Sequence, residues 1–593
     1  MVIVKNIAFS PNSAQNDGSS RMGVRCRVFS SHDFASIRSV WVDLRHTSIF
    51  DRLPIKPDPG FVLDRSGEGD YAGEMEIPLH LEPGRYRIPI VAEDSTGARG
   101  RGMGTFSVDY KRREDTPPVG SPEFLRQMEA LTGEDFTSGN TVRVLDGGAD
   151  ALNLRFSLIE GAARQINLQT YALGGSGSGA RMLDTLIRKA EEGVSVNMVL
   201  NSDTQLPLSP VSILRLKYNQ FLSDLGRDGS EERRPSGNAK GRREKKRRVR
   251  LGGITALFFN RNPLHEDDDK DPVTGPIKDH WLQKLQDASR RIKGELELDE
   301  LKSTSGAGPG GLPALPLLDY AVHEKILVVD GRYAIVGGRN LEDKYFTHWT
   351  DLDLALSGPI VGRIQAGFLS GFAQIAASAP NTRLPEAIAE WTEGQGGVSA
   401  LFVNSRPWER KYGTTTAMVH SIEAATMSIF AFSQFVILPD CIIKDALMDA
   451  ARRGVDVRII TNSQNTGQEV SFSAGYYLTI KYLAPLLEAG VRVFEVVGSP
   501  NPEEPQPYMH NKEFLFDDSL CAIGSFNLSV RSCYVESENL VFINDTDFCR
   551  SRISAFMSFQ ERLTREISAD QLSAQQGLHK GKMEMSRFFE LLF

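Results

Sequence analysis

The sequence predicts an α/β protein in which two related, pseudo-symmetric α/β/α lobes follow an N-terminal all-β domain. Three observations predict this fold class. A short string of polar residues occurs twice with the same spacing, the pattern of helices and strands around each copy is repeated, and residues 1–110 instead alternate apolar and polar residues in short runs. Repeated βαβ units indicate a duplicated α/β domain, whereas period-two alternation broken by turn residues is typical of an antiparallel sandwich.

Residues 1–110 form the first predicted domain. Alternating runs separated by Gly, Pro and Asp occur at 23–29, 40–44, 72–77 and 85–92. They predict an antiparallel β-sandwich. The stretch 83–97 resembles immunoglobulin-like modules of bacterial surface and secreted enzymes, and this resemblance implies a spacer or a binding domain without catalysis. Residues 111–141 are predicted to be a linker that docks onto the first lobe.

The two lobes are predicted at residues 142–390 and 396–575. In each lobe a helix is followed by a strand, a second helix and a second strand, and the first of these strands lies at 165–171 in one lobe and at 427–432 in the other. Both halves therefore read as βαβ units. A pseudo-twofold axis between two such lobes would place the two copies of the polar string side by side.

The first lobe carries an insertion at about 223–318. This segment contains a basic cluster at 242–250, an acidic cluster at 266–269 and a run rich in Gly and Pro at 305–316, while 251–262 is predicted to be a strand of the lobe. The polar parts of the insertion cannot bury a core. The basic cluster either lies against anionic lipid headgroups or is a solvated loop, and the sequence leaves both readings open.

The duplicated string supplies residues that phosphodiester chemistry requires. The spacing from its His to its Asn is 17 residues in both copies, which read His323, Lys325, Asp330, Gly337, Asn340 and His510, Lys512, Asp517, Gly524, Asn527. In His-x-Lys on a β-strand, the two side chains share a face and can converge on one phosphate. Cleavage without a metal needs a nucleophile, an acid for the leaving alkoxide and fixed positive charge. Two copies of the string provide all three.

The two strings resemble the HKD motifs of the phospholipase D superfamily, and the resemblance covers roughly residues 140 to 575. Within that superfamily the bacterial cardiolipin synthases are similar in the segments after each motif, at 337–346, 349–353, 358–359 and 527–538. The resemblance implies lobes of the phospholipase D type. It also implies a ping-pong mechanism through a phosphohistidine.

The resemblance assigns a role to each motif residue. His323 is expected to attack phosphorus and His510 to serve as acid and base, although the near symmetry of the motifs leaves the reverse assignment open. The motif lysines and asparagines are expected to hold the phosphate oxygens. These residues are Lys325, Lys512, Asn340 and Asn527. Asp351 and Glu538, each 28 residues after its histidine, match the family's orienting acids.

The remaining motif positions have supporting roles. Gly338 and Ser525 are expected to bind substrate. Asp330 and Asp517 are expected to be structural residues that cap turns beside the site. No metal or other cofactor is expected, because the His and Cys residues have no zinc-type spacing.

Composition limits the setting in which the enzyme works. The formal net charge of -8 argues against a protein that coats nucleic acid, and five cysteines without paired spacing argue against a disulfide framework. There is no signal-like N-terminal segment and no apolar run approaching about 18 residues. We expect a protein that is cytoplasmic or peripheral at the inner face of a membrane. The predicted amphipathic tail at 576–593 either dips into that interface or packs on the second lobe.

Three functions fit these features. The first is a phosphatidyltransferase of the cardiolipin-synthase kind, with a phospholipid substrate and a membrane surface as its partners. The second is a hydrolytic phospholipase D, in which water takes the place of the acceptor alcohol. The third is a nuclease, which ranks lowest because superfamily nucleases are often single-motif dimers and because this chain is acidic. No nucleic-acid partner is expected, and the oligomeric state is open.

Overall fold

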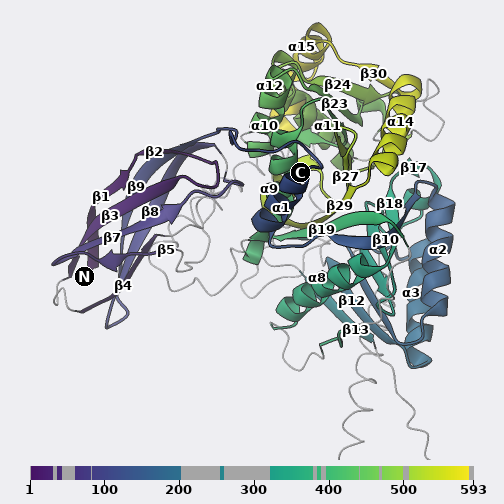
Figure 1. Cartoon of the computed structure of the whole chain (residues 1–593), viewed down its shortest axis with the longest axis horizontal. Coiled ribbons are helices and arrows are strands. Elements are labelled where there is room, and N and C mark those ends of the chain that lie inside the picture. The colour runs from purple at the N-terminus through teal and green to yellow at the C-terminus, as the bar shows by residue number, and fades with distance from the viewer. Residues whose placement is uncertain are drawn as a thin grey trace, which may run out of the picture.

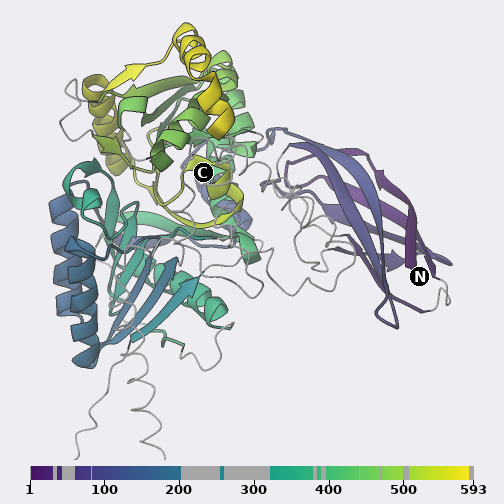
Figure 2. The ribbon, with the colours of Figure 1, turned by 180° about the vertical axis from the view of Figure 1, so that it is seen from behind.

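The computed structural model describes residues 2–30, 36–42, 61–81, 83–201, 254–259, 321–377, 384–388, 396–409, 411–439, 441–466, 470–498 and 507–586. Apart from one strand at 254–259, the predicted insertion lies outside these residues, as do its basic and acidic clusters and positions 587–593 of the predicted tail. The described part of the chain consists of an N-terminal β domain beside a larger α/β body (Figures 1 and 2).

The N-terminal domain consists of two sheets whose inner faces share one apolar core. Its strands are β1 (Val2–Ser10), β2 (Ser13–Gln15), β3 (Arg21–Ser30), β4 (Ile37–Val42), β5 (Phe61–Val62), β6 (Asp64–Arg65), β7 (Asp70–Glu76), β8 (Gly84–Asp94) and β9 (Arg99–Asp109). The strand orders are β1-β3-β7-β6 and β2-β9-β8-β4-β5. In β3, Met22, Val24 and Val28 are buried while Arg25 and Arg27 are exposed, which is the period-two pattern of a strand with one face on a core. The predicted all-β region is therefore confirmed.

The α/β body is built on one extended sheet, to which 17 of the described strands belong. The strands of the body, including short pairs outside that sheet, are β10 (Thr137–Leu145), β11 (Gln165–Thr170), β12 (Ser195–Asn201), β13 (Ile254–Phe259), β14 (Ala321–Val322), β15 (Ile326–Val329), β16 (Tyr333–Gly337), β17 (Trp349–Thr350), β18 (Asp353–Ser357), β19 (Val398–Arg406), β20 (Lys411–Tyr412), β21 (Ser428–Phe432), β22 (Val436–Ile437), β23 (Asp456–Asn462), β24 (Arg492–Val496), β25 (Tyr508–Met509), β26 (Glu513–Phe516), β27 (Leu520–Gly524), β28 (Leu528–Ser529), β29 (Glu536–Asn544) and β30 (Thr564–Glu566).

The same set of pairings occurs in both halves of the body. In the first half β11 pairs in parallel with β12 and β12 with β13, while β11, β15, β16 and β18 pair antiparallel in that order. In the second half β21 pairs in parallel with β23 and β23 with β24, while β21, β26, β27 and β29 pair antiparallel. The mixed α/β class predicted from the sequence is confirmed.

Helices cover the outer faces of the sheet. They are α1 (Pro122–Thr132), α2 (Gly148–Gly161), α3 (Gly177–Glu191), α7 (Lys344–Thr347), α8 (Pro359–Ala376), α9 (Gly413–Ala424), α10 (Ile442–Arg452), α11 (Val470–Tyr482), α12 (Ala484–Glu488), α13 (Val530–Tyr534), α14 (Thr546–Leu563), α15 (Ala569–Leu578) and α16 (Lys580–Ser586), with 3₁₀ turns at Pro407–Glu409 and Gln464–Thr466. In α10 the apolar residues Ile442, Ile443, Ala446, Leu447 and Ala450 are buried, which is the helical spacing of a single core-facing stripe.

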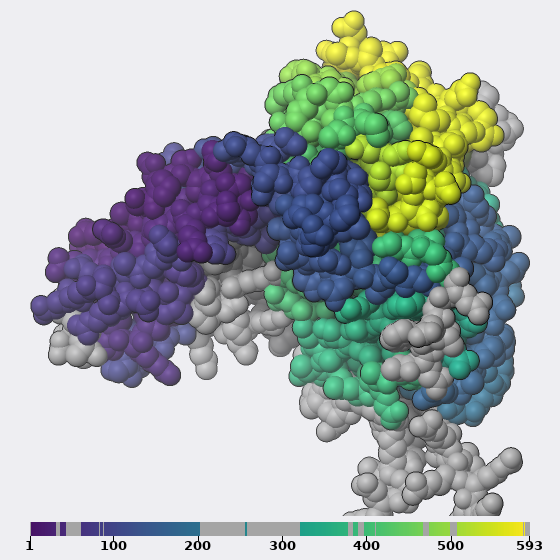
Figure 3. All heavy atoms as spheres, viewed as in Figure 1, coloured from purple at the N-terminus to yellow at the C-terminus, as the bar shows by residue number. Residues whose placement is uncertain are grey.

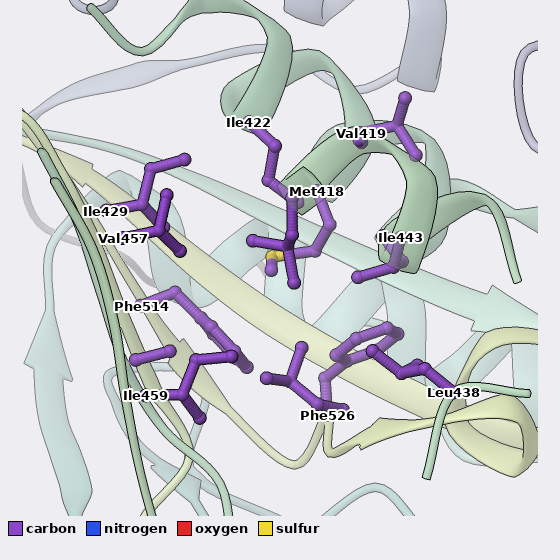
Figure 4. Packing of buried hydrophobic residues seen from close by; sticks show 14 of the residues in the cluster. Met418, Val419, Ile422, Ile429, Leu438, Ile443, Val457, Ile459, Phe514 and Phe526 are labelled. Atoms are coloured by element: carbon purple, nitrogen blue, oxygen red, sulfur yellow. The ribbon is translucent and has the colours of Figure 1, made fainter. Parts of the chain in front are cut away.

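The three largest apolar clusters among the described residues of the body show how its halves are joined. Alternate residues of β15 face opposite ways: Leu327 and Val329 join the cluster under α2 and α3, whereas Ile326 and Val328 join a cluster that also contains strand residues of the second half. The second half has its own cluster under α9 and α10, part of which Figure 4 shows around Met418, Phe514 and Phe526. The middle cluster therefore joins the two halves of the body through a common core.

The two HKD strings do not lie within continuous strands, which corrects the sequence prediction. His323, Lys325, His510 and Lys512 lie in irregular segments between β14 and β15 and between β25 and β26. The reason is a change of partner: β14 pairs with β29 of the other half, whereas β15 pairs with β11 and β16 of its own half. The strand has to break where the chain leaves one partner for the next.

The linker predicted at 111–141 contacts both halves of the body. On the first half, Asp135 pairs with Arg363 of α8 at 2.7 Å. The contacts of its earlier residues are with the second half. Arg113 Nε donates a 3.0 Å hydrogen bond to Glu423 on α9, and the ring of Phe124 on α1 stacks on His420 at a centroid distance of 4.5 Å. The linker also contains α1, whose side chain Phe124 is fully buried in the core of the second half. Figure 3 shows this blue segment against the green and yellow second half.

The described part of the predicted tail packs on α11 of the second half. Gln576 donates a 2.7 Å hydrogen bond to the carbonyl of Ile480, and Lys582 Nζ lies 3.0 Å from the hydroxyl of Tyr477. Met583 packs against the core of the second half. Of the two readings left open by the sequence, these contacts support packing for 576–586. Among the described helices, none has the length and apolar character needed to cross a membrane.

Truncation of the linker helix at its buried aromatic ring tests this docking. Phe124→Ala should lower the free energy of unfolding by about 3–5 kcal/mol, because a fully buried ring is lost from the core of the second half. Arg126→Ala on the exposed face of α1 should change it by no more than about 0.5 kcal/mol. Denaturant unfolding followed by tryptophan fluorescence measures both, and equal effects would contradict the proposed anchoring role of this ring.

Candidate active site

The two motif segments are held by short strands from opposite halves of the body. β14, just before His323, pairs in parallel with β29, and the His323 N–H donates to the carbonyl of Ser537 at 3.1 Å. β25, just before His510, pairs in parallel with β17, and the His510 N–H donates to the carbonyl of Thr350 at 2.8 Å. Each histidine backbone is therefore fixed by the half to which it does not belong.

The orienting acids are exchanged in the same way. His323 Nδ1 lies 2.9 Å from Glu538 Oε1, and His510 Nδ1 lies 2.6 Å from Asp351 Oδ2. Each carboxylate therefore contacts the histidine of the other motif, not the histidine 28 residues before it. A carboxylate at Nδ1 fixes the tautomer and the ring orientation, and it leaves Nε2 as the nitrogen that can react.

Glu538 is held by two hydroxyl groups. Ser532 Oγ donates to Glu538 Oε1 at 2.6 Å, and Ser525 Oγ donates to Oε2. All three residues are buried. Ser525, predicted to bind substrate, thus has its hydroxyl on the acid that orients His323.

Asp351 is held by backbone groups and by a neighbouring arginine. Its Oδ1 accepts a 2.7 Å hydrogen bond from the N–H of Leu352. Arg339, which is buried, donates to the carbonyl of Asp351 at 2.5 Å and to Asp353 Oδ2 at 3.0 Å. Gly338 lies so close to Asp351 that a Cβ atom at this position would overlap Oδ1. The glycine predicted to bind substrate therefore also makes room for an orienting acid.

The two motif lysines are buried beside the histidines. Lys325 Nζ donates to the carbonyl of His323 and Lys512 Nζ to the carbonyl of His510, both at 2.6 Å. Lys512 Nζ also lies 3.0 Å from His510 Nδ1 and donates to Gln434 Oε1 at 3.3 Å. The four groups form one electrostatic cluster, since Lys325 and the His323 imidazole both lower the pKa of His510.

Burial shifts the ionisable groups of this cluster toward their neutral forms. It lowers the pKa of His323 and His510 well below 6.5, and nearby lysines lower both further. Burial also lowers the pKa of Lys325 to about 8 and that of Lys512 to about 7, and it raises the pKa of Glu538 to about 7. An anion bound between the lysines would favour their charged forms and reverse part of this shift.

The two motif asparagines differ in their contacts. Asn340 Nδ2 donates to the hydroxyl of Tyr345 at 2.8 Å, and Asn340 Oδ1 accepts from the N–H of Ala172 at 3.3 Å. The backbone N–H of Asn527 donates to Ser532 Oγ at 3.1 Å. The amide of Asn340 is thus fixed by protein atoms at both ends.

The motif aspartates lie at turns, away from the imidazoles. Asp330 and Asp517 have positive φ angles of 52° and 51°, in the left-handed region that Asp tolerates better than most residues. The carboxylate of Asp330 accepts from three consecutive backbone N–H groups at 163–165, and that of Asp517 accepts from three at 426–428. Each aspartate joins the hairpin after its motif to the start of a parallel strand.

Sequence reasoning missed several side chains around the imidazoles. The ring of Tyr171, which follows β11, lies edge-on to the ring of His323, with 5.1 Å between the ring centroids. Lys325 Nζ lies 5.5 Å from the centroid of the tyrosine ring. Around His510, the ring centroids of Tyr345 and Trp349 lie 5.0 and 5.7 Å from that of the imidazole. The signal that could have found them is position: each directly follows a repeated strand or lies just before an orienting acid.

Among the described residues, one group has donor atoms close enough to hold a metal ion: His323, Glu536 and Glu538. Each already has a protein partner, because Nδ1 contacts Glu538, Glu536 accepts from Arg531, and Glu538 accepts from two serines. Their proximity follows from this network. The expectation that no metal is needed stays a prediction.

Comparison with known proteins identifies the family. The model of the family described as cardiolipin synthase, PLD-like domain, matches residues 156–374 and 418–559, which together are more than half of the chain. The chain belongs to this family. The two matched segments contain both HKD motifs and both orienting acids, and the membership confirms the resemblance predicted from the motifs.

Individual relatives match less of the molecule. Cardiolipin synthase A of Pseudomonas syringae pv. syringae is 30% identical over 313 residues, which are 52% of this chain and 59% of the relative. Cardiolipin synthase A of Pseudomonas fluorescens is 29% identical over 472 residues, which are 78% of this chain and 77% of the relative. The chain thus spans about three fifths of the first relative. The solved structure of phosphatidylserine synthase from Haemophilus influenzae covers 79% of this chain and 100% of its own, at 10% identity and a TM-score of 0.46.

The lowered lysine pKa values predict how anion binding depends on pH. Lysines are charged below their pKa, so sulfate affinity should fall as pH rises through about 7 for Lys512 and about 8 for Lys325. Sulfate keeps its own charge across this range. Titration calorimetry between pH 6 and pH 9 measures the effect, and Lys512→Met should remove the part near pH 7. An affinity independent of pH would contradict the lysine assignment.

The close approach at Gly338 predicts a second effect. Gly338→Ala should displace Asp351 from His510 and reduce phosphodiester turnover by about 100-fold, because small misplacements of a catalytic group cost that much. Turnover of bis(p-nitrophenyl) phosphate provides the measurement. Gly397→Ala is the matched control, since a Cβ there meets nothing within 4 Å. Full activity of the Gly338 variant would show that the Asp351 contact is dispensable.

Proposed function

We propose that the protein is a phosphatidyltransferase that moves a phosphatidyl group from a glycerophospholipid to an alcohol through a phosphohistidine, as cardiolipin synthases do. The observation that carries this proposal is the pair of crossed contacts, His323 to Glu538 and His510 to Asp351, in a chain that belongs to the cardiolipin synthase family. In each imidazole a carboxylate contacts Nδ1, so Nε2 of both rings can react with one phosphodiester.

The first half-reaction assigns one role to each ring. Nε2 of neutral His323 attacks phosphorus, the bond to the leaving alkoxide breaks, and His510 gives that alkoxide a proton. Glu538 stabilises the positive charge on the His323 ring, and Asp351 holds the imidazolium of His510 before it gives up its proton. The opposite assignment of the two rings is the alternative that the near symmetry leaves open.

The phosphate oxygens need positive charge and donors throughout the reaction. Lys325 and Lys512 are buried beside the two imidazoles, where a fixed charge acts in a medium of low polarity and is worth more than in water. We assign the amides of Asn340 and Asn527 to the same oxygens, and Asp330 and Asp517 to the structural turns described above. The backbone around Gly338 and Ser525 lies beside the orienting acids and would line the phosphate.

The second half-reaction decides between transfer and hydrolysis. His510 takes the proton of the incoming hydroxyl, whose oxygen attacks phosphorus and releases His323. His323 is 7% exposed and His510 is 3% exposed, and such burial supports transfer to an alcohol because water reaches the intermediate poorly. A hydrolytic phospholipase D that releases phosphatidic acid is the second candidate. A nuclease is the third, and the acidic balance of the chain disfavours it.

The domain plan follows the same proposal. We assign residues 1–110 to an immunoglobulin-like sandwich, 142–390 and 396–575 to two pseudo-symmetric lobes of the phospholipase D type, and 111–141 to the segment between them. The repeated order of strand pairings supports the two lobes, and the two sheets with a common core support the sandwich. We place the protein at the surface of a membrane, where its phospholipid substrate lies.

A lipid assay tests the function. The protein is incubated with vesicles of phosphatidylglycerol and phosphatidylethanolamine plus a primary alcohol, and the products are resolved by mass spectrometry. Cardiolipin and the phosphatidyl ester of the added alcohol are the expected products. Phosphatidic acid alone would indicate the hydrolase, and cleavage of DNA without lipid turnover would indicate the nuclease.

Variants of the two histidines test the mechanism in the same assay. His323→Ala and His510→Ala should each abolish turnover, because each ring has a role that the other cannot fill. His348→Ala, a change at an exposed histidine, is the matched control and should retain activity. A metal chelator should have no effect, and strong inhibition by it would overturn the metal-free mechanism.

A further inference from the structure

Positions 349 and 536 are equivalent in the two motifs but carry different residues. Trp349 precedes Asp351 by two residues, as Glu536 precedes Glu538. The two positions also pair in the same way, since Trp349 lies opposite Tyr508 in the β17–β25 pair and Glu536 lies opposite Ala321 in the β14–β29 pair. A difference between their side chains therefore makes the surroundings of the two histidines unequal.

Glu536 brings a second carboxylate to His323. Its Oε2 lies 3.8 Å from His323 Nδ1, and its Oε1 accepts a 2.6 Å hydrogen bond from Arg531 Nε on α13. The side chains of Glu536 and Arg531 are only 8% and 7% exposed. Because side chains two apart on a strand share a face, Glu536 and Glu538 approach the same edge of the imidazole.

His510 lacks a second carboxylate among the described residues. It has one carboxylate, Asp351, and in place of a second acid it has the indole of Trp349 at 5.7 Å. Lys344 Nζ lies 4.7 Å over that indole, and Lys512 Nζ lies 3.0 Å from His510 Nδ1. Cations lie near both rings, but His323 faces two carboxylates and His510 faces one.

We propose that Glu536, held in place by Arg531, is a positioning residue that acts through His323 and makes this imidazole, rather than His510, the one that carries the phosphoryl group. The inference rests on the proposed function and deepens it, because it gives a physical reason why the two histidines have different roles. When Nε2 of His323 forms its bond to phosphorus and the alkoxide leaves with the proton of His510, the His323 ring becomes positively charged and stays so until the acceptor oxygen displaces it. Two carboxylates at Nδ1 stabilise that ring through the whole interval.

The charges around His323 set the sign of the effect. The ring faces Glu536 and Glu538 from β29, Arg531 from α13, Lys325 and Lys512 from the two motif segments, and Tyr171 after β11. Glu536 raises the pKa of His323, and its effect exceeds the opposite effect of Arg531. Removal of the carboxylate charge should therefore lower the pKa of the ring and destabilise its phosphorylated form.

Glu536→Gln tests the proposal, because the amide oxygen can still accept from Arg531 while the charge is lost. In the lipid transfer assay, kcat should fall about tenfold, and the acid limb of the kcat/KM profile should move to lower pH by about one unit. The trapped phosphoryl label should lie on His323 in the unaltered protein and should be less abundant in the variant. Because the phosphohistidine bond is labile in acid, the label is mapped by peptide mass spectrometry at alkaline pH after an alkaline quench. Glu536→Asp, which keeps the charge, should restore part of the activity.

Glu423→Gln is the matched control. Glu423 is a buried glutamate that also pairs with an arginine, Arg113, but it lies in α9 away from the imidazoles. Its pH profile should coincide with that of the unaltered protein. A Glu536→Gln profile that also coincides, or a label found on His510 of the unaltered protein, would overturn the inference. The label needs no variant, so a label on His510 would overturn the inference even if Glu536→Gln does not fold, and the Glu536→Asp variant then tests the role of the carboxylate. Failure of the unaltered protein to turn over any phosphodiester would instead overturn the proposed function.

Discussion

The crossed contacts between histidines and carboxylates are the constraint on which the rest of the site depends. Glu538 can reach His323 only if β29 lies beside β14, and Asp351 can reach His510 only if β17 lies beside β25. The common apolar core between the two halves holds both strand pairs in register. Packing of side chains far from the phosphate position therefore controls the orientation of both rings.

Burial of so much charge requires partners for every group, since an unpaired buried charge destabilises a fold strongly. Around Glu538 the partners are serine hydroxyls, and around Asp351 they are a backbone N–H and the contacts of the buried Arg339. The lysines donate to backbone carbonyls of their own histidines. These contacts keep the site assembled while burial shifts its groups toward neutral forms, ready to respond to an anion.

Much of this could be predicted from the sequence because it is local or repeated. The motif residues, the α/β class and the all-β character of the first 110 residues follow from spacing and periodicity. The exchange of acids did not follow, because strand pairs of two residues leave no periodic pattern. The contacting histidine and acid are also 215 and 159 residues apart and lie in different halves. For the same reason the break of each strand at its histidine and the docking of Phe124 on α9 were missed. Glu536 was overlooked because its counterpart, Trp349, has a different chemical character.

The exchange of β-strands between the halves has a consequence for fragments of the chain. A polypeptide divided between α8 and β19 would yield one piece with His323 and Asp351 and another with His510 and Glu538, so neither piece alone would contain a complete pair. Both pairs would form together, in the single event of association. The yield of competent sites would then scale with the product of the two fragment concentrations, and one half could not retain partial competence without the other.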